Sequence, residues 1–259
     1  MPVELERRDD VDILTLNRPE ALNALSFAVL REIEMRVGEV ERGIDEGEVR
    51  ALLVAGAGDR AFCAGADVKE LMGRTPLEHR RGLRSGQALF ERIANLPVPS
   101  VALVDGYALG GGLELAMACT FRLATWAARM GLPEIKLGLV PGYGGTQRLP
   151  RLVGEANAPD IVMTGRMVRA EEGLSMGLVN RIVEGDPIEA GLAFAAEITG
   201  HSLPALRLAR DAVMRALDLP VREGLEVEAD IGALSYQTAD AAEGMSAFIE
   251  KRAPVFRDA

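Results

Sequence analysis

The chain has 259 residues, 48% of them apolar, and a formal net charge of −10. This length and apolar content support a sizeable globular core, while the negative charge disfavours nonspecific binding to nucleic acid or anionic lipid. No apolar run approaches the roughly 20 residues that span a bilayer, and residues 1–10 lack the apolar centre of a signal peptide, so we expect a soluble protein. Its two cysteines, Cys63 and Cys119, are typical of a reduced, cytoplasmic protein.

The first two thirds of the chain alternate strand and helix patterns. Apolar residues on both sides of the polar turn 8–10 predict a β-hairpin. Beyond Ser26, a candidate N-cap, apolar residues recur at helical spacing and are followed by a buried strand at 51–55. This alternation predicts an α/β core with helices packed on largely parallel strands. The further predicted elements are a helix through Ala94, a strand at 100–104, a helix from near Gly111, and strands around 121–125 and 178–183.

The chain changes character after residue 186. Helical patterns continue there with caps or breakers at Pro204, Pro220 and Thr238, and no convincing strand follows. We therefore divide the chain into an α/β core, residues 1–185, and a helical region, residues 186–259. The last helix carries an apolar stripe that either the core or a neighbouring subunit has to cover. The stripe consists of Met245, Phe248 and Ile249, with Arg252 beside them.

Several patterns suggest functions that their surroundings contradict. Residues 56–61 satisfy the dinucleotide fingerprint G-x-G-x-x-A, but a glycine-punctuated loop follows where the fingerprint needs a helix. Residues 173–177 match the G-x-S-x-G elbow, but they lie between a helix and a strand, the reverse of the required order. His79 and His201 have no cysteine or carboxylate at ligand spacing. We therefore predict no metal site.

Three segments have compositions suited to chemistry. Small residues at 64–69 leave a loop that brings backbone N–H groups close to a ligand. Three glycines within 108–114 open a helix, where unpaired N–H groups and the positive end of the helix dipole favour a developing negative charge. Residues 131–134, followed by the glycine-rich stretch 140–146, place a carboxylate on a rigid turn beside another helix start.

Two glutamates, Glu114 and Glu134, belong to these segments. Each has an ordinary explanation when taken alone, because an acidic residue in the first turn of a helix also stabilises the helix dipole. Together, two backbone donor loops and two carboxylates supply an oxyanion hole and a general acid/base pair. These groups suit a reaction next to a carbonyl group that becomes an enolate.

At these residues the sequence resembles the crotonase superfamily, the enoyl-CoA hydratases and isomerases, over essentially the whole chain. The resemblance implies a spiral of β-β-α turns with a helical C-terminal trimerisation region, usually assembled as a hexamer of two trimers. The motifs that carry it are residues 14–19 (LTLNRP), 22–25 (LNAL), 61–67 (AFCAGAD), 133–138 (PEIKLG), 144–149 (GGTQRL) and 243–252 (EGMSAFIEKR).

The resemblance also implies roles for individual residues. Ala66 and Gly111 match the two residues whose backbone N–H groups hold the thioester oxygen. Glu114 and Glu134 match the pair that positions water, takes its proton and delivers a proton to C2, so that one carboxyl starts protonated and the other ionised. The positions that match the substrate and CoA site are Ala64, Ala66, Asp67, Val68, Lys69 and Gly111, with Phe248 and Lys251 reaching CoA from a neighbouring subunit.

The activity implied is that of an enoyl-CoA hydratase in fatty-acid β-oxidation or related metabolism, which adds water to a trans-2-enoyl-CoA to give a 3-hydroxyacyl-CoA. Coenzyme A is then part of the substrate, and no separate cofactor is expected. The alternative within the family is a Δ3,Δ2-enoyl-CoA isomerase, which needs a single base, and Glu114 favours hydration. A non-catalytic acyl-CoA-binding or RNA-binding relative is the alternative of another class. RNA binding is disfavoured because acids outnumber basic residues in the helix within 26–50.

Two residues depart from the family's pattern. Thr120 stands where many relatives have an aspartate, which predicts the loss of a structural hydrogen bond. Pro159 interrupts a stretch that is usually one unbroken helix, so we expect a kink or an early stop there. Neither change removes a predicted catalytic group. The arginine-rich stretch 74–92 is typical of a solvated helix face and indicates no preference for acyl chain length.

Overall fold

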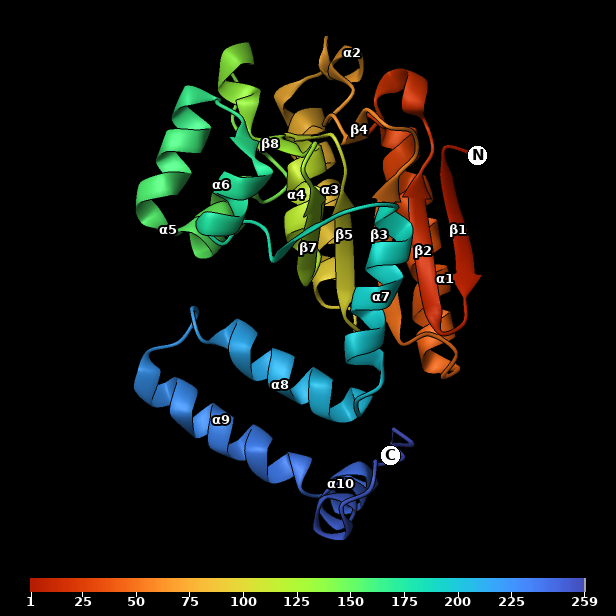
Figure 1. The fold of residues 1–259 in the computed structure, drawn as a ribbon. Helices are drawn as coiled ribbons and strands as arrows, with labels where there is room; N and C mark the ends of the chain where they lie inside the picture. The colour runs from red at the N-terminus through yellow and green to blue at the C-terminus, as the bar shows by residue number, and fades with distance from the viewer. Residues whose placement is uncertain (259) are drawn as a thin grey trace. The chain divides into compact units, whose positions relative to one another are not determined.

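The computed structural model describes residues 1–258; Ala259, the last residue of the predicted helical region, lies outside them. The chain separates into two compact units, Met1–Ala195 and Ala196–Ala259. Strands and helices alternate in the first unit and only helices occur in the described part of the second, as the sequence predicts (Figure 1).

The first unit is built on a six-stranded sheet with the order β1-β2-β3-β5-β7-β10. The hairpin β1(Val3–Arg8) and β2(Val11–Leu16) is antiparallel, and the remaining neighbours pair in parallel. The central strands β3 and β5 are buried almost throughout, as expected for parallel strands covered on both faces. The other strands of this sheet are β3(Ala51–Gly56), β5(Ser100–Val104), β7(Phe121–Thr125) and β10(Arg181–Val183).

A second sheet, of four very short strands, has the order β4-β6-β8-β9. The sequence does not predict this sheet, because strands of two or three residues are too short to show an alternating pattern. Strands β4, β6 and β8 run parallel to one another, so their carboxyl ends lie at one edge of the sheet. The bounds are β4(Ala61–Cys63), β6(Tyr107–Leu109), β8(Arg129–Gly131) and β9(Val168–Arg169).

Helices cover the sheets of the first unit. Helix α1(Phe27–Asp45) begins at the predicted cap Ser26, whose hydroxyl accepts a hydrogen bond from the backbone N–H of Val29 (3.2 Å). Gly191 of α7 lies against Leu53 and Leu103, so α7 packs on β3 and β5 (Figure 1). The other helical elements are η1(Pro19–Ala21), α2(Val68–Leu71), α3(Pro76–Ala94), α4(Gly111–Ala118), η2(Pro133–Leu137), α5(Gly145–Thr164), α6(Ala170–Ser175) and α7(Pro187–Thr199).

The structure corrects the expectation about Pro159. The kink predicted there lies instead at Gly154, whose backbone is non-helical (φ 80°, ψ 166°), and the helix continues past Pro159 to Thr164. Thr120 makes hydrogen bonds of its own, and a loss relative to an aspartate stays a prediction. The Thr120 hydroxyl is 3.4 Å from that of Ser100, which also accepts a bond from the Thr120 N–H (3.0 Å).

The second unit consists of helices whose caps are Ser202, Pro220 and Thr238. Helices α8 and α9 pack against each other, yet neither contains a buried residue. Phe248 of the apolar stripe is 86% exposed in the single chain. Coverage of this stripe by a neighbouring subunit stays a prediction. The bounds are α8(Leu203–Arg215), α9(Val221–Ser235) and α10(Ala239–Glu250).

Candidate active site

The short parallel sheet brings the three segments selected from the sequence to one edge. Residues 64–69 follow β4, the glycine run at 110–112 follows β6, and Glu134 comes three residues after β8. Because β4, β6 and β8 are neighbouring parallel strands, the segments after their carboxyl ends lie side by side. Functional residues gather at such strand ends in parallel sheets.

The loop after β4 is held by residues 22–25. The N–H of Leu25 donates to the Gly65 carbonyl (2.8 Å), and the N–H of Asp67 donates to the Leu25 carbonyl (2.9 Å). A third bond runs from the Ala64 N–H to the Leu22 carbonyl (2.9 Å). Within residues 1–258 the backbone N–H of Ala66 donates to no protein acceptor, so it is available to a ligand.

The start of α4 lies directly against this loop. A β-carbon on Gly65, whose φ is 102°, would be 2.8 Å from the Leu109 carbonyl oxygen and 3.6 Å from the Gly111 nitrogen. A β-carbon on Gly112 would collide with the Cys63 carbonyl. Only glycine permits so close an approach of two backbones. As the first residue of α4, Gly111 has an N–H without an intrahelical acceptor, and the described chain supplies no other.

Glu114 is the one charged side chain in α4, a helix whose residues are all buried. The residue is only 1% exposed. Its Oε1 accepts hydrogen bonds from the backbone N–H groups of Tyr143 (2.8 Å) and Gly145 (2.7 Å). Burial raises the pKa of Glu114 to about 7, the two amide bonds oppose this rise, and the charge of Glu134 adds to it. This carboxyl therefore titrates near neutral pH.

Glu134 is the second residue of η2, directly after Pro133, as the predicted rigid turn requires. A β-carbon on Gly110, the N-cap of α4, would lie 2.8 Å from Oε1 of Glu134, so the side chain reaches the start of that helix. Its Oε2 is buried and has no hydrogen-bond partner. Burial raises the pKa of this carboxyl as well. A buried carboxyl oxygen without a partner is the kind of group that a bound ligand satisfies.

The remaining predicted residues lie in two places. Asp67 caps α2 and accepts a bond from the Lys69 N–H (3.2 Å), while Val68 and Lys69 are exposed. Phe248 and Lys251 belong to the second unit, where Lys251 ends α10 in a left-handed conformation (φ 57°). The first unit therefore brings together every predicted site residue except these two.

The residues that hold Glu114 are not predictable from local sequence. The glycine-rich stretch 140–146 is identifiable, but nothing in it marks the N–H groups of Tyr143 and Gly145 as partners of Glu114. These partners are 29 and 31 residues from Glu114 in sequence. One sequence feature does point to hydrogen-bond donors here. The stretch 140–146 is a second glycine-rich helix start, and such a turn exposes several N–H groups at once.

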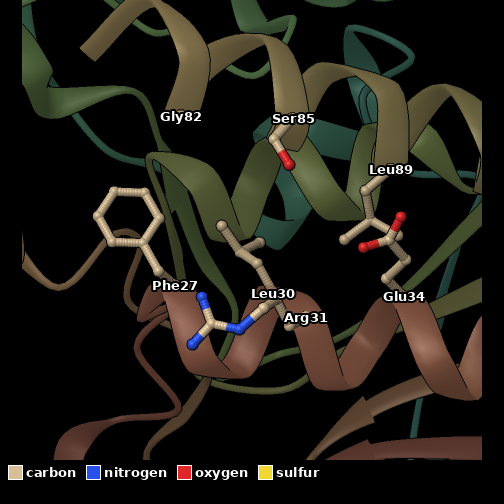
Figure 2. A pocket seen from close by; sticks show the side chains of 7 residues that line it. All are labelled: Phe27, Leu30, Arg31, Glu34, Gly82, Ser85 and Leu89. Carbon is tan, nitrogen blue, oxygen red and sulfur yellow. The ribbon is translucent and has the colours of Figure 1, made fainter. Parts of the chain in front are cut away.

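A hollow of about 150 Å³ lies elsewhere, between α1 and α3 (Figure 2). None of the predicted site residues lines it, so it does not mark the chemistry that the two carboxyls indicate. The candidate site therefore lies at the carboxyls and the free N–H groups. The hollow is lined by Phe27, Leu30, Arg31, Glu34, Gly82, Ser85 and Leu89.

Among the described residues, no three or more His, Cys, Asp or Glu side chains are grouped so that they could hold a metal ion. No helix in this part of the chain has both the length and the apolar content needed to cross a membrane.

The chain is similar to enoyl-CoA hydratases in sequence and in fold. Residues 6–259 match the model of the enoyl-CoA hydratase/isomerase family. The chain is 39% identical to the short-chain-enoyl-CoA hydratase of Clostridium acetobutylicum, over 96% of this chain and 95% of that protein. It is 42% identical to a probable enoyl-CoA hydratase of Rhizobium meliloti, over 98% and 96% respectively. The crystal structure of the Bacillus anthracis enoyl-CoA hydratase superposes with a TM-score of 0.93, at 35% identity and full coverage of both chains.

The chain therefore belongs to the enoyl-CoA hydratase/isomerase family and has the crotonase fold, as the resemblance implied.

Proposed function

We propose that this protein is an enoyl-CoA hydratase, which adds water across the 2,3 double bond of a trans-2-enoyl-CoA. The observation that carries the proposal is the pair of glutamates, the buried Glu114 and the half-buried Glu134, next to two backbone N–H groups without partners. The names of the most similar relatives, which are hydratases of enoyl-CoA, agree with it.

The N–H groups of Ala66 and Gly111 form the oxyanion hole of the proposed site. They bind the thioester oxygen, which gains negative charge when water attacks C3 and the electrons of the double bond move toward the carbonyl. The dipole of α4 points its positive end at the same oxygen. Donors that are already in place stabilise this charge without reorganisation during the reaction, which is why such groups contribute strongly to catalysis.

Glu114 acts as the base in this proposal and Glu134 as the acid. The two amide bonds to Oε1 of Glu114 favour its ionised form and orient it, so that it takes a proton from the attacking water. The partnerless Oε2 of Glu134 carries the proton that is delivered to C2. The water oxygen bonds to C3, and the enolate collapses to the thioester as C2 is protonated. Burial raises the pKa of both carboxyls.

Coenzyme A recognition and assembly are further parts of the proposal. Ala64, Asp67, Val68 and Lys69 line the CoA site, and Phe248 and Lys251 reach it from a neighbouring subunit of a trimer or hexamer in the cytoplasm. The exposure of Phe248 and Ile249, at 86% and 78%, supports such a contact. Sedimentation as a trimer or hexamer is expected, and a stable monomer at micromolar concentration would contradict the assembly.

The activity is tested with crotonyl-CoA and the single variants Glu114→Gln and Glu134→Gln. Each is expected to lower kcat for hydration by about 10²–10⁴, with a much smaller change in ligand affinity, because glutamine keeps the volume and removes the proton transfer. Assays of the same variants with a 3-enoyl-CoA test the alternative activity, that of an isomerase. An isomerase would lose activity in Glu134→Gln and keep most of it in Glu114→Gln, and wild-type hydration by Glu114→Gln would refute the mechanism.

A further inference from the structure

The segment that holds Glu114 is itself fixed at three consecutive carbonyl groups. The Gly142 carbonyl accepts a bond from Nε2 of Gln87 on α3 (2.8 Å). The Tyr143 carbonyl accepts one from Nη1 of Arg148 on α5 (3.2 Å), and the Gly144 carbonyl accepts one from the Arg148 backbone N–H (2.8 Å). The orientation of each peptide in this turn is therefore set by a bond on its oxygen side.

Two of these peptides present their N–H groups to the candidate base. The third, which joins Tyr143 to Gly144 and accepts the bond from the Arg148 guanidinium, lies between them. One peptide unit joins Gly142 to Tyr143, so its oxygen contacts Gln87 while its N–H contacts Glu114. Hydrogen bonds in such a chain polarise one another, and a carbonyl that accepts a bond makes its own N–H a better donor. Arg148 also reaches α3, because its Nη2 donates to Oε2 of Glu91 (2.9 Å).

The guanidinium of Arg148 is fitted to this turn. A β-carbon on Gly144, whose φ is 114°, would collide with Nη1 of Arg148. The Arg148 side chain is 19% exposed, whereas Glu91 is 63% exposed. The ion pair with Glu91 lies close to water and contributes little by itself. The bond to the carbonyl of Tyr143, a residue only 5% exposed, is the contact that matters for the site.

We infer that Gln87 and Arg148 are positioning residues, which keep the Glu114 carboxylate oriented and ionised. Gln87 holds the peptide whose N–H, that of Tyr143, donates to Glu114, and the Arg148 guanidinium holds the peptide between the two donor peptides. The inference rests on the proposed hydratase function. Neither side chain is placed against the reacting atoms; both act through the peptides of residues 142–145. The titratable and charged groups that act on Glu114 are Glu134 from η2, Arg148 from α5 and the Tyr143 hydroxyl.

The test compares Gln87→Met and Arg148→Met with matched changes that leave the turn intact. Gln147→Met and Arg151→Met are the controls, because the Gln147 side chain bonds Thr146 and the Arg151 side chain bonds the Gln147 carbonyl of its own helix. Steady-state hydration of crotonyl-CoA is measured from pH 5 to 9. Both test variants are expected to lower kcat by about 10-fold with little change in KM, since misplaced catalytic groups lose rate more than binding.

The pH profile separates positioning from a general loss of structure. Removing either donor destabilises ionised Glu114, so the acid limb should move to higher pH by about 0.5–1 unit, further for Arg148→Met because a positive charge is also lost. Arg148→Lys keeps the charge and should restore part of the rate and of the limb. If Arg148→Met does not fold, Gln87→Met and Arg148→Lys carry the comparison.

A ¹³C NMR titration of the glutamate carboxyl groups gives the same comparison without substrate. A higher pKa of Glu114 in the test variants and an unchanged one in the controls supports the inference. The inference would be overturned if the test variants had the same acid limbs and the same carboxyl titrations as the controls, even if their kcat had fallen. Wild-type protein that hydrates no enoyl-CoA would refute the proposed function instead, and the NMR comparison would still decide whether the two side chains tune Glu114.

Discussion

The two carboxyls of the site have opposite surroundings. Glu114 lies within a helix that is buried on all sides, and two backbone N–H groups hold one of its oxygens. Glu134 lies on a short 3-10 turn, is only partly buried, and has a carboxyl oxygen with no partner. Both pKa values are raised by burial. A raised pKa therefore does not make two acids equivalent. Two hydrogen bonds favour the ionised form of Glu114, whereas Glu134 has a carboxyl oxygen that no such bond holds.

The largest effect is expected when both carboxyls are removed. The double variant Glu114→Gln/Glu134→Gln should hydrate crotonyl-CoA more slowly than either single variant, each of which loses about 10²–10⁴ in kcat. Because the two carboxyls act on one water, the loss should be smaller than the product of the single losses. Pre-steady-state and steady-state rates of the four proteins give the comparison. Fully multiplicative losses would show that the two groups work independently.

The next effect concerns stability and pH. The pKa of Glu114 is raised in the folded state from 4.5 to about 7, so the carboxyl contributes stability below pH 4.5 that is lost as the pH rises through 7. Glu114→Gln does not titrate, so its stability relative to the wild type should rise between these values, by up to about 3 kcal/mol. Thermal unfolding from pH 4 to pH 8 measures this. A stability difference that stays constant with pH would contradict the raised pKa.

A smaller effect is expected from alanine substitutions at the glycines next to the two carboxyls. In Gly145→Ala the β-carbon would lie 2.9 Å from Oε1 of Glu114, and in Gly110→Ala it would lie 2.8 Å from Oε1 of Glu134. Displacing either oxygen should lower kcat by roughly 10- to 100-fold. Gly110 also has a positive φ of 51°, so its alanine variant carries an added strain of about 1–3 kcal/mol.

The measured outcome is therefore a split between kcat and Tm. Gly145→Ala should act mainly on kcat, and Gly110→Ala should lower both kcat and Tm. Gly47→Ala supplies a control for strain alone, because Gly47 also has a positive φ (74°) and a β-carbon there meets nothing within 4 Å. Equal losses of Tm in Gly145→Ala and Gly110→Ala would remove the distinction between the two surroundings.

The sequence by itself determined the elements whose signals are local. The strands at 100–104 and 121–125 have the predicted bounds, and Ser26 caps α1, because hydrophobic runs and capping residues act within a few positions of the chain. Glu114 was identifiable as one acidic residue in an apolar, glycine-led helix, and Glu134 followed from the rigid Pro-Glu turn. The roles of these glutamates, of Ala66 and of Gly111 remain predictions from the family resemblance.

The contacts between these elements depend on the tertiary structure. The short strands β4, β6 and β8 show no pattern of their own, yet their parallel pairing aligns the segments that follow them. The break in α5 lies at Gly154 and not at Pro159, because glycine readily adopts the positive φ that interrupts a helix. The partners of Glu114 come from residues 143 and 145, about 30 positions away. Contacts of this range depend on the packing of α3, α4 and α5, which no local periodicity encodes.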